Sequence, residues 1–209
     1  MTIRSSAPVT LAVVLLLSGC SGLDLEDEVG RGPAFNLFEY FDGQVEAWGM
    51  VQDWRGRVVR QFAVTIEGTI RGDELTLDEV FNYADGEQST RQWRIKRNSD
   101  DNAATRYTGT ANDIIGSAAG IESGDAVRWD YEMDIETSGR TYRVRFADRL
   151  WRIDGDTVTN RAKIRKFGFV AAEVILFMRR VDEQKQVSLD RAFQWHAATR
   201  RTAANRHLP

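Results

Sequence analysis

The feature that most constrains this chain is a two-residue alternation of apolar and polar side chains, which recurs from Gln44 to Arg180. It is clearest over residues 127–135, VRWDYEMDI, where every odd-numbered residue is apolar and every even-numbered residue is charged. Successive side chains of a β-strand point to opposite faces, so the pattern predicts a strand with one face on a core and the other in water. Such runs recur about every ten residues between turn signals, which is typical of an all-β domain.

The turn cluster Thr137-Ser138-Gly139 joins this run to a second alternating run at 142–146 and predicts a hairpin of one register. A two-residue turn makes both faces match at once, and a slip by one residue would spoil both. On the apolar face the predicted pairs are Tyr131 with Phe146, Met133 with Val144 and Ile135 with Tyr142. On the polar face they are Asp134 with Arg143 and Glu132 with Arg145.

The remaining alternating runs predict a meander of neighbouring strands. Trp48 and Met50 are expected to face Phe62 across the turn at 55–57. Residues 169–178 are apolar on both faces, which predicts a more deeply buried strand. We therefore predict an all-β antiparallel meander of about eight to ten strands. Because closure removes exposed edges, we expect a lipocalin-like barrel, with a β-sandwich as the alternative.

The stretch FNLFEYF at 35–41, just ahead of the first strand, carries aromatic residues at helical spacing. Phe35, Phe38 and Phe41 share one face of a helix, so we expect a short helix that plugs one end of the barrel. An aromatic platform for a ligand is the alternative, although aromatic clusters usually belong to a core.

The C-terminal tail, residues 181–209, departs from the strand pattern and is polar and basic. Ser188 can cap a helix, after which Leu189 and Phe193 share a face, so the tail is predicted to be partly helical. Three placements remain open for this helix: along an anionic membrane surface, over a barrel mouth, or exposed to solvent.

Residues 1–19 have the organisation of a secretory signal peptide. Arg4 supplies a positive charge, and residues 9–17 form an apolar core that is too short to span a bilayer, which needs about 20 residues. Leu17-Ser18-Gly19-Cys20 resembles the lipobox of bacterial lipoproteins at all four positions. The resemblance implies cleavage before Cys20, which would carry a diacylglycerol and an N-acyl group as a membrane anchor.

Cys20 is the only cysteine in the chain, so an internal disulfide and cysteine catalysis elsewhere are excluded. The next residue, Ser21, resembles the lipoprotein sorting pattern for passage to the outer membrane, which implies a lipid-anchored protein on its periplasmic face. Residues 20–33 are then the lipid anchor and a polar, glycine-bearing tether, and the barrel domain is expected over residues 34–180.

Charge and histidine placement limit the chemistry. The net charge is −3 and there is no basic run, which argues against a nucleic-acid partner. His196 and His207, the only histidines, both lie in the tail, so a histidine metal site or a serine–histidine relay in the strand region is excluded. We expect no enzyme activity, no metal and no cofactor beyond the acyl groups on Cys20.

Three polar residues fall on faces that are otherwise apolar: Glu79, Asn160 and Glu173. A buried carboxylate is costly unless it is hydrogen-bonded or neutralised. These residues therefore indicate either a wet cavity or a structural network of polar groups.

The stretch TGTANDIIGSAAG at 108–120 is rich in small residues. Gly116, Ala118 and Gly120 line one face of the predicted strand, where glycine often marks a bend or the close approach of another group. Barrel curvature and room for a ligand are both open explanations. The candidate ligand-binding residues, all expected to face the barrel interior, are Trp48, Phe62, Glu79, Trp93, Gly116, Trp129, Tyr131, Phe146 and Asn160.

Four motifs of this chain, in this order, are FNLFEYFDGQVEAWGMVQD, LTLDEVFNYADGE, YTGTANDIIGSAAG and KFGFVAAEVILFMRR. They resemble the bacterial lipoproteins of domain-of-unknown-function family 3833 over residues 35–180. The resemblance implies a proteobacterial envelope lipoprotein and brings no assigned activity.

Two functions remain open at this point. The first is a membrane-tethered, lipocalin-like protein that binds an apolar or amphipathic small molecule, such as a lipid, inside the barrel. The second is a structural or assembly lipoprotein with a filled interior, whose outer surface binds another envelope component. A cavity of roughly 300 Å³ or more favours the first.

Overall fold

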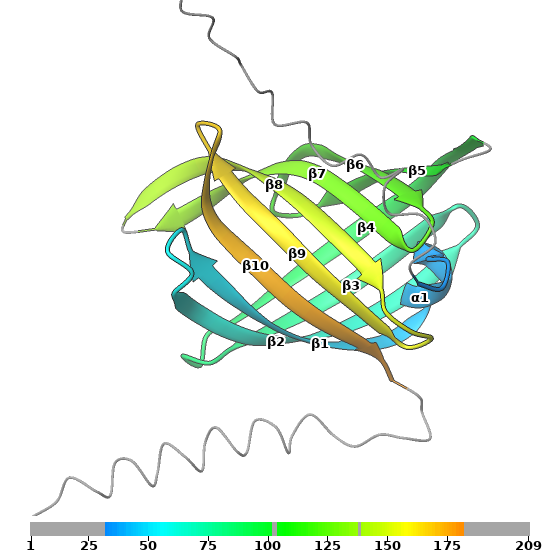
Figure 1. The fold of residues 1–209 in the computed structure, drawn as a ribbon, viewed down its shortest axis with the longest axis horizontal. Coiled ribbons are helices and arrows are strands. Elements are labelled where there is room, and N and C mark those ends of the chain that lie inside the picture. Colours follow the sequence, from blue (N-terminus) through cyan, green and yellow to red (C-terminus); the bar gives the residue numbers. More distant parts are fainter. Residues whose placement is uncertain (1–31, 102–103, 138, 182–209) are drawn as a thin grey trace, which may run out of the picture.

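The computed structural model describes residues 32–101, 104–137 and 139–181, which form a closed antiparallel barrel with a short helix at one end (Figure 1). The strands follow one another around the barrel in chain order, and the last pairs with the first. The elements are α1 (Leu37–Phe41), β1 (Gly43–Asp53), β2 (Val58–Arg71), β3 (Glu74–Tyr83), β4 (Gln88–Asp101), β5 (Ala104–Ala111), β6 (Ile114–Ser123), β7 (Ala126–Thr137), β8 (Arg140–Arg152), β9 (Thr157–Lys166) and β10 (Phe169–Arg180).

The prediction of an antiparallel lipocalin-like barrel with a short helix before the first strand is confirmed. The predicted signal peptide, the lipidated Cys20 and the predicted tail helix lie outside the described residues.

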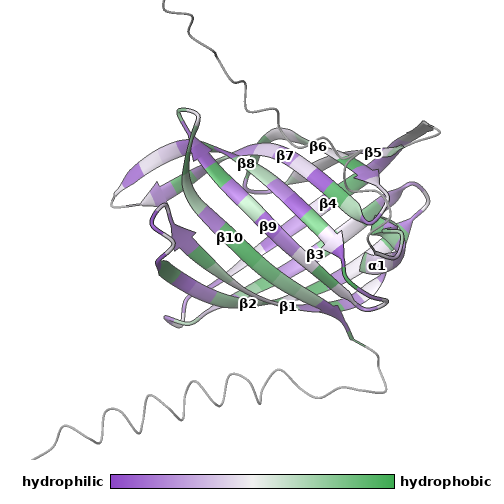
Figure 2. Ribbon diagram, in the orientation of Figure 1, coloured by the Kyte–Doolittle hydropathy of each residue, from purple (hydrophilic) through white to green (hydrophobic). Residues whose placement is uncertain are grey.

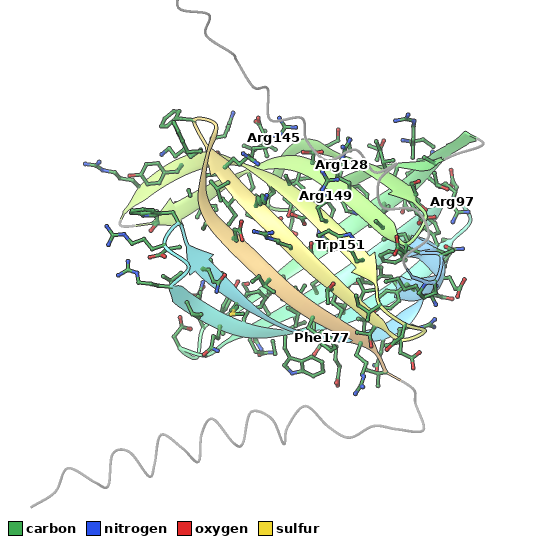
Figure 3. All side chains as sticks on the ribbon, in the orientation of Figure 1. Arg97, Arg128, Arg145, Arg149, Trp151 and Phe177 are labelled. Atoms are coloured by element: carbon green, nitrogen blue, oxygen red, sulfur yellow. The ribbon has the colours of Figure 1, made fainter. Side chains whose placement is uncertain are left out.

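The β7–β8 hairpin has the predicted register: Tyr131 lies opposite Phe146, Met133 opposite Val144, Ile135 opposite Tyr142, Asp134 opposite Arg143 and Glu132 opposite Arg145. Arg143 also forms the expected ion pair with Asp134, at 3.1 Å. Arg145 instead pairs with Asp130, at 3.1 Å, and Arg128 approaches the same carboxylate. Figure 3 labels both arginines, which lie on the outer side of the barrel.

Polar and apolar residues alternate along the strands, which Figure 2 shows as purple and green bands. The apolar residues form the buried interior. The bulkiest side chains that are completely buried include Leu37 and Tyr40 of α1. Others come from the strand ends next to that helix, namely Val45, Leu75, Val127 and Val158. Burial of such an aliphatic side chain stabilises the fold by about 1.5–3 kcal/mol. The densest part of the core is therefore at the helix end of the barrel.

Helix α1 is the plug predicted from its aromatic residues, and it is tied to strands on different sides of the barrel. Glu122 on β6 accepts hydrogen bonds from the Leu37 amide and from the Tyr107 hydroxyl, both at 2.8 Å. The Tyr40 hydroxyl donates to the Asp156 carbonyl oxygen, ahead of β9, at 3.1 Å. These bonds satisfy groups that the plug would otherwise bury unpaired, so they fix its position.

Strand β2 admits the plug only because it has no side chain at Gly68. A Cβ atom at that position would lie 1.5 Å from the carbonyl oxygen of Phe41. The Arg97 guanidinium of β4 stacks on the Phe38 ring of the plug, 4.5 Å from its centre, and Figure 3 shows Arg97 beside α1. The helix end of the barrel is thus closed by close packing.

The prediction that Trp48 and Met50 face the interior is wrong. A register shift between Val51 and Gln52 interrupts the pairing of β1 with β2. Such a β-bulge reverses the face that counting from the turn assigns to each residue. The odd-numbered residues of β1 point inward instead, and Ala47 is completely buried.

Strand β10 is also not buried on both faces, contrary to prediction. Its inward residues, Val174 and Leu176, alternate with outward ones. Glu173 is outward and forms an ion pair with Arg161 on β9 at 2.8 Å, so its predicted place on the interior face is wrong. Phe177 is 44% exposed, and Figure 3 shows it on the outside of the barrel.

Gly116 does not face the interior either. It is exposed, has a φ of +69°, and lies within a register shift between Ile115 and Ala119 of β6. A glycine is favoured in this left-handed conformation. Its role is therefore to bend the strand, which is the curvature explanation of the small-residue stretch.

Candidate functional site

The barrel encloses a cavity of about 360 Å³. Its floor is formed by Leu37 and Phe41 of the plug. It extends to Arg60 and Tyr83 near the opposite end, where the odd-numbered strands turn into the next ones; we call this end the mouth. The volume lies in the range of small-molecule sites. The interior is therefore hollow, as the ligand-binding hypothesis requires.

Aromatic rings line the cavity in two groups. Along one wall, Tyr131 stacks on Phe146 with ring centres 5.0 Å apart, and Trp93 lies 5.4 Å from Tyr131 and 6.1 Å from Trp129. Nearer the mouth, Phe62 lies 5.9 Å from Phe81 and 5.8 Å from Tyr83. These rings give the cavity a mainly apolar surface.

The small residues in front of this wall do not open room for a ligand. A Cβ atom on Gly120 would lie 2.8 Å from the Trp129 indole, and one on Gly109 would lie 3.1 Å from it. The indole occupies the space that the two glycines leave free. Glycine at these positions is therefore explained by the close approach of Trp129.

Polar side chains interrupt the apolar lining at two places. On β3 and β4, Glu79 lies opposite Arg91 in the strand pairing. Arg91 in turn forms an ion pair with Asp113 at 2.6 Å, between β5 and β6. The positive charge of Arg91 is thus shared between a carboxylate at the mouth and one inside the barrel.

The second polar group lies on β7, β8 and β9. Asp148 accepts a hydrogen bond from the Tyr131 hydroxyl at 3.3 Å. The Asn160 side chain acts to lower the pKa of Asp148, against the larger effect of burial. Burial raises the pKa of Tyr131, so its hydroxyl stays protonated and remains a donor. No ion pair to Asp148 forms within the described residues, although Arg91 acts on it through space.

Several buried oxygen atoms of these groups have no hydrogen-bond partner among the described residues. Inside the barrel they are Oε2 of Glu79, Oδ1 of Asp148 and Oδ1 of Asn160, and at the mouth Oδ1 of Asp113. Burial raises the pKa of Glu79 from 4.5 to about 7 and that of Asp148 from 3.8 to about 7. Since an unpaired buried polar atom costs free energy, the cavity offers acceptors that a ligand with hydrogen-bond donors would satisfy.

Basic side chains stacked on aromatic rings stand at the mouth. The Arg60 guanidinium lies 3.4 Å from the centre of the Tyr83 ring and is paired with Asp85 and Glu87. At the end of β9, the Lys166 ammonium lies 3.3 Å from the centre of the Tyr142 ring. The mouth therefore differs in charge from the lumen, whose free polar atoms are mainly acceptors.

The structure brings together most of the predicted site residues. Those that line the cavity are Phe62, Glu79, Trp93, Trp129, Tyr131, Phe146 and Asn160. Trp48 and Gly116 do not, for the reasons given above. That a ligand contacts the seven residues in the cavity remains a prediction.

Sequence reasoning missed Arg91 and Asp148, the two charged residues that organise the polar groups. Both were available from the alternation, because Arg91 is in register with Trp93 and Asp148 is in register with Phe146. A charged residue next to an apolar run usually indicates that the buried part of the strand has ended. Arg91 and Asp148 face the lumen because their strands continue along the cavity beyond the apolar run.

Within the described ranges, no group of three or more His, Cys, Asp or Glu side chains is placed to hold a metal ion. Nor does that part of the chain contain a helix with the length and apolar character needed to cross a membrane.

Fold and cavity together define a small lipocalin-like barrel with one plugged end and a partly polar lumen. The chain belongs to the family of proteins of unknown function DUF3833, whose profile matches residues 14–180. No curated protein matches it. Among solved structures it is similar to the S-type phycobiliprotein lyase of Guillardia theta, with a TM-score of 0.50 and 9% sequence identity, over 70% of this chain and 92% of that one. At this identity the likeness shows the fold alone.

The raised pKa of Asp148 predicts how stability depends on pH. Between about pH 4 and pH 7 the unfolded chain releases this proton and the folded protein keeps it, so the contribution of Asp148 to stability falls as pH rises and levels off above the folded pKa. Asp148→Asn removes the titrating carboxyl, and with it this fall in the free energy of unfolding as the pH rises. We expect the variant to gain up to a few kcal/mol relative to wild type between pH 4.5 and pH 8, since each pKa unit corresponds to about 1.4 kcal/mol.

Urea unfolding at a series of pH values measures this difference. Asp134→Asn, on the outer face of β7, is the control; it removes the ion pair with Arg143 but should not reproduce the gain in stability with rising pH expected of Asp148→Asn. A difference between Asp148→Asn and wild type that does not change with pH would contradict the assignment.

Proposed function

We propose that this protein is a lipoprotein of the bacterial cell envelope that binds a hydrophobic or amphipathic small molecule inside its barrel. In this proposal, acyl groups on Cys20 hold it at the periplasmic face of the outer membrane. Residues 20–33 act as the tether between the lipid and the barrel. The ligand lies in the lumen between the plug and the mouth.

The observation that carries the proposal is the cavity of about 360 Å³ lined by aromatic and aliphatic side chains. Filling such a lumen with side chains would have stabilised the fold, because protein interiors are normally close-packed. A hollow interior in a closed barrel is instead the arrangement of a ligand site. The alternative of a scaffold with a filled interior does not fit this cavity.

The polar groups of the lumen indicate what kind of polar group the ligand carries. Unpaired oxygen atoms of Glu79, Asp148 and Asn160 accept hydrogen bonds and cannot supply them when the carboxyls are ionised. The rest of the lining is mainly apolar. An amphipathic molecule with an apolar body and a hydroxyl or protonated amine as its polar group matches both parts. The likeness to the lyase concerns the fold alone, so this inference about the ligand rests on the chemistry of the lumen.

A side chain added inside the barrel should block binding. Ala162 on β9 is 3% exposed and lines the cavity, so Ala162→Phe fills part of the ligand's volume. We expect binding of the fluorescent probe N-phenyl-1-naphthylamine to weaken about tenfold or more, which corresponds to at least about 1.4 kcal/mol. Fluorescence titration of the full chain measures this affinity.

The matched control is Ala171→Phe, which adds the same ring at an exposed position of the neighbouring strand β10. It should bind the probe as wild type does. Equal affinity of the two variants, with thermal transitions that show both to be folded, would place the probe outside the lumen and sink the proposal.

The polar group of the ligand is tested with amphiphiles that share one alkyl chain. Dodecylamine and dodecanol should displace the probe about tenfold more effectively than dodecanoate, because a hydrogen bond to a charged group is worth about 1.5–3 kcal/mol. Asp148→Asn and Glu79→Gln should reduce this preference for the amine. Tighter binding of dodecanoate would show that the basic groups at the mouth select the ligand instead.

The anchoring part of the proposal depends on Cys20. Replacing it in the full chain, Cys20→Ser, should abolish incorporation of labelled palmitate and shift the protein out of the outer-membrane fraction. The variant Ser21→Thr keeps the thiol and serves as the control for expression. Outer-membrane association that is unchanged in Cys20→Ser would contradict a lipid anchor.

A further inference from the structure

We propose that the mouth of the barrel docks on an anionic phospholipid bilayer through two neighbouring hairpin tips. The first tip is Trp54–Val59, the β1–β2 turn with the first two residues of β2. The second is Arg165–Phe169, the β9–β10 turn with the adjoining ends of both strands. Neither the family match nor the cavity assigns a role to these residues. The surface lies outside the lumen, so the proposed ligand site and this docking surface succeed or fail separately.

Exposed apolar side chains concentrate on these two tips. Trp54 is 68% exposed, Val59 60%, Phe167 88% and Phe169 79%. With Val58, they are five of the seven large hydrophobic residues that are exposed in the described part of the chain; the others are Ile153 and Phe177. Scattered exposed apolar residues need no explanation, but a cluster at one end of the molecule marks a contact surface.

The two tips lie next to each other because β1 pairs with β10. Asp53, at the end of β1, is opposite Ala172 in that pairing. Trp54 from one tip and Val170 from the other side line a common depression on the surface. In Figure 1 both tips are at the end of the barrel that faces away from α1.

Phe167 occupies a backbone conformation that disfavours it. Its φ is +50°, and that of Gly168 is +82°, so both residues of this two-residue turn are left-handed. Asn, Asp and Gly are the residues that such a turn favours, and a bulky residue there is destabilising. Because the ring is 88% exposed, the isolated barrel does not offset this strain by burial. The aromatic side chain therefore serves a contact outside the molecule.

The charges of the tips select the partner. The first tip carries Arg55 and Arg57, and the second carries Arg165 and Lys166. Arg57 is paired with Asp53, which directly precedes the first tip, so Arg55, Arg165 and Lys166 supply the positive charge. The Arg55 guanidinium stacks on the Trp54 ring, 4.4 Å from its centre, and so combines an aromatic and a basic group at one point. Trp and basic residues together are typical of segments that lie at a membrane interface, where anionic lipids attract Lys and Arg.

The first tip is held in shape for such a contact. The carboxylate of Asp53 accepts hydrogen bonds from the backbone amides of Arg55 and Arg57, at 2.9 and 3.0 Å, and pairs with the Arg57 side chain. Trp54 is thus presented on a rigid turn, which reduces the entropy lost on docking. Docking would also place the mouth of the cavity against the acyl chains, where an amphipathic ligand resides.

The experiment measures whether Trp54 enters a bilayer, with the full chain carrying Cys20→Ser so that no acyl group contributes. Vesicles of phosphatidylcholine and phosphatidylglycerol contain brominated acyl chains, which quench tryptophan in contact with them. The emission of Trp54 is obtained as the difference between this protein and the same protein with Trp54→Phe. We expect quenching with phosphatidylglycerol present, and at least about tenfold weaker partitioning into phosphatidylcholine alone.

Variants separate the tips from the rest of the chain. Phe169→Ser should weaken partitioning, and Arg55→Gln should weaken it about fivefold, which corresponds to about 1 kcal/mol. Phe177→Ser, on the outer wall of β10, is the control and should change nothing. Unquenched Trp54, or an equal loss in the Phe177 variant, would overturn the proposal. A dimer in solution, with twice the mass of one chain and the tips buried between its two copies, would also overturn the proposal.

Phe167→Asn distinguishes a contact with the bilayer from a structural role of Phe167, because the two predict opposite changes in stability. Asn favours the left-handed conformation, so the thermal transition should rise while partitioning into anionic vesicles weakens. A variant that loses both stability and partitioning would show that Phe167 supports the fold, and would contradict its assignment to the bilayer contact.

Discussion

Strand β1 pairs with β10 from Val45 opposite Arg180 to Asp53 opposite Ala172, and this contact closes the sheet. Every strand then has two neighbours, so no edge is left to pair with another chain. Closure with ten strands also fixes the size of the interior, since a barrel of eight strands is about the size that side chains can fill. The helix between Leu37 and Phe41 fills one end of the extra space and leaves the remainder as a cavity. The plug and the lumen are therefore two consequences of the same closure.

The two ends of the barrel have different physical characters. At the plug, Gly68 and Glu122 fit and bind the helix so closely that the end is sealed. At mid-height, Glu79 and Asp148 keep carboxyl groups in an apolar lumen, at a cost that their hydrogen bonds only partly offset. Residues that lower stability in this way concentrate at functional sites. A ligand that donates hydrogen bonds to these carboxyl groups would supply the partners that they lack in the empty barrel.

Much of this architecture could be predicted from the sequence, because period-two alternation reports directly which face of a strand is buried. The β7–β8 register followed from its turn, and Glu79 and Asn160 were placed inside correctly. The same reasoning failed where the backbone departs from regular pairing: a bulge next to Val51 turned Trp48 outward, and the bend at Gly116 removed it from the lumen. Bulges depend on contacts between strands, which alternation within one strand does not contain.

The central claim is that the lumen holds a small molecule, and native mass spectrometry of the full-length protein tests it most directly. The protein would be isolated in mild detergent from the envelope of cells that produce it. We predict a complex with one bound amphipathic molecule, released on collisional activation and absent from Ala162→Phe. A mass that never exceeds that of the polypeptide and its acyl groups, with the same result for Ala162→Phe, would contradict the claim.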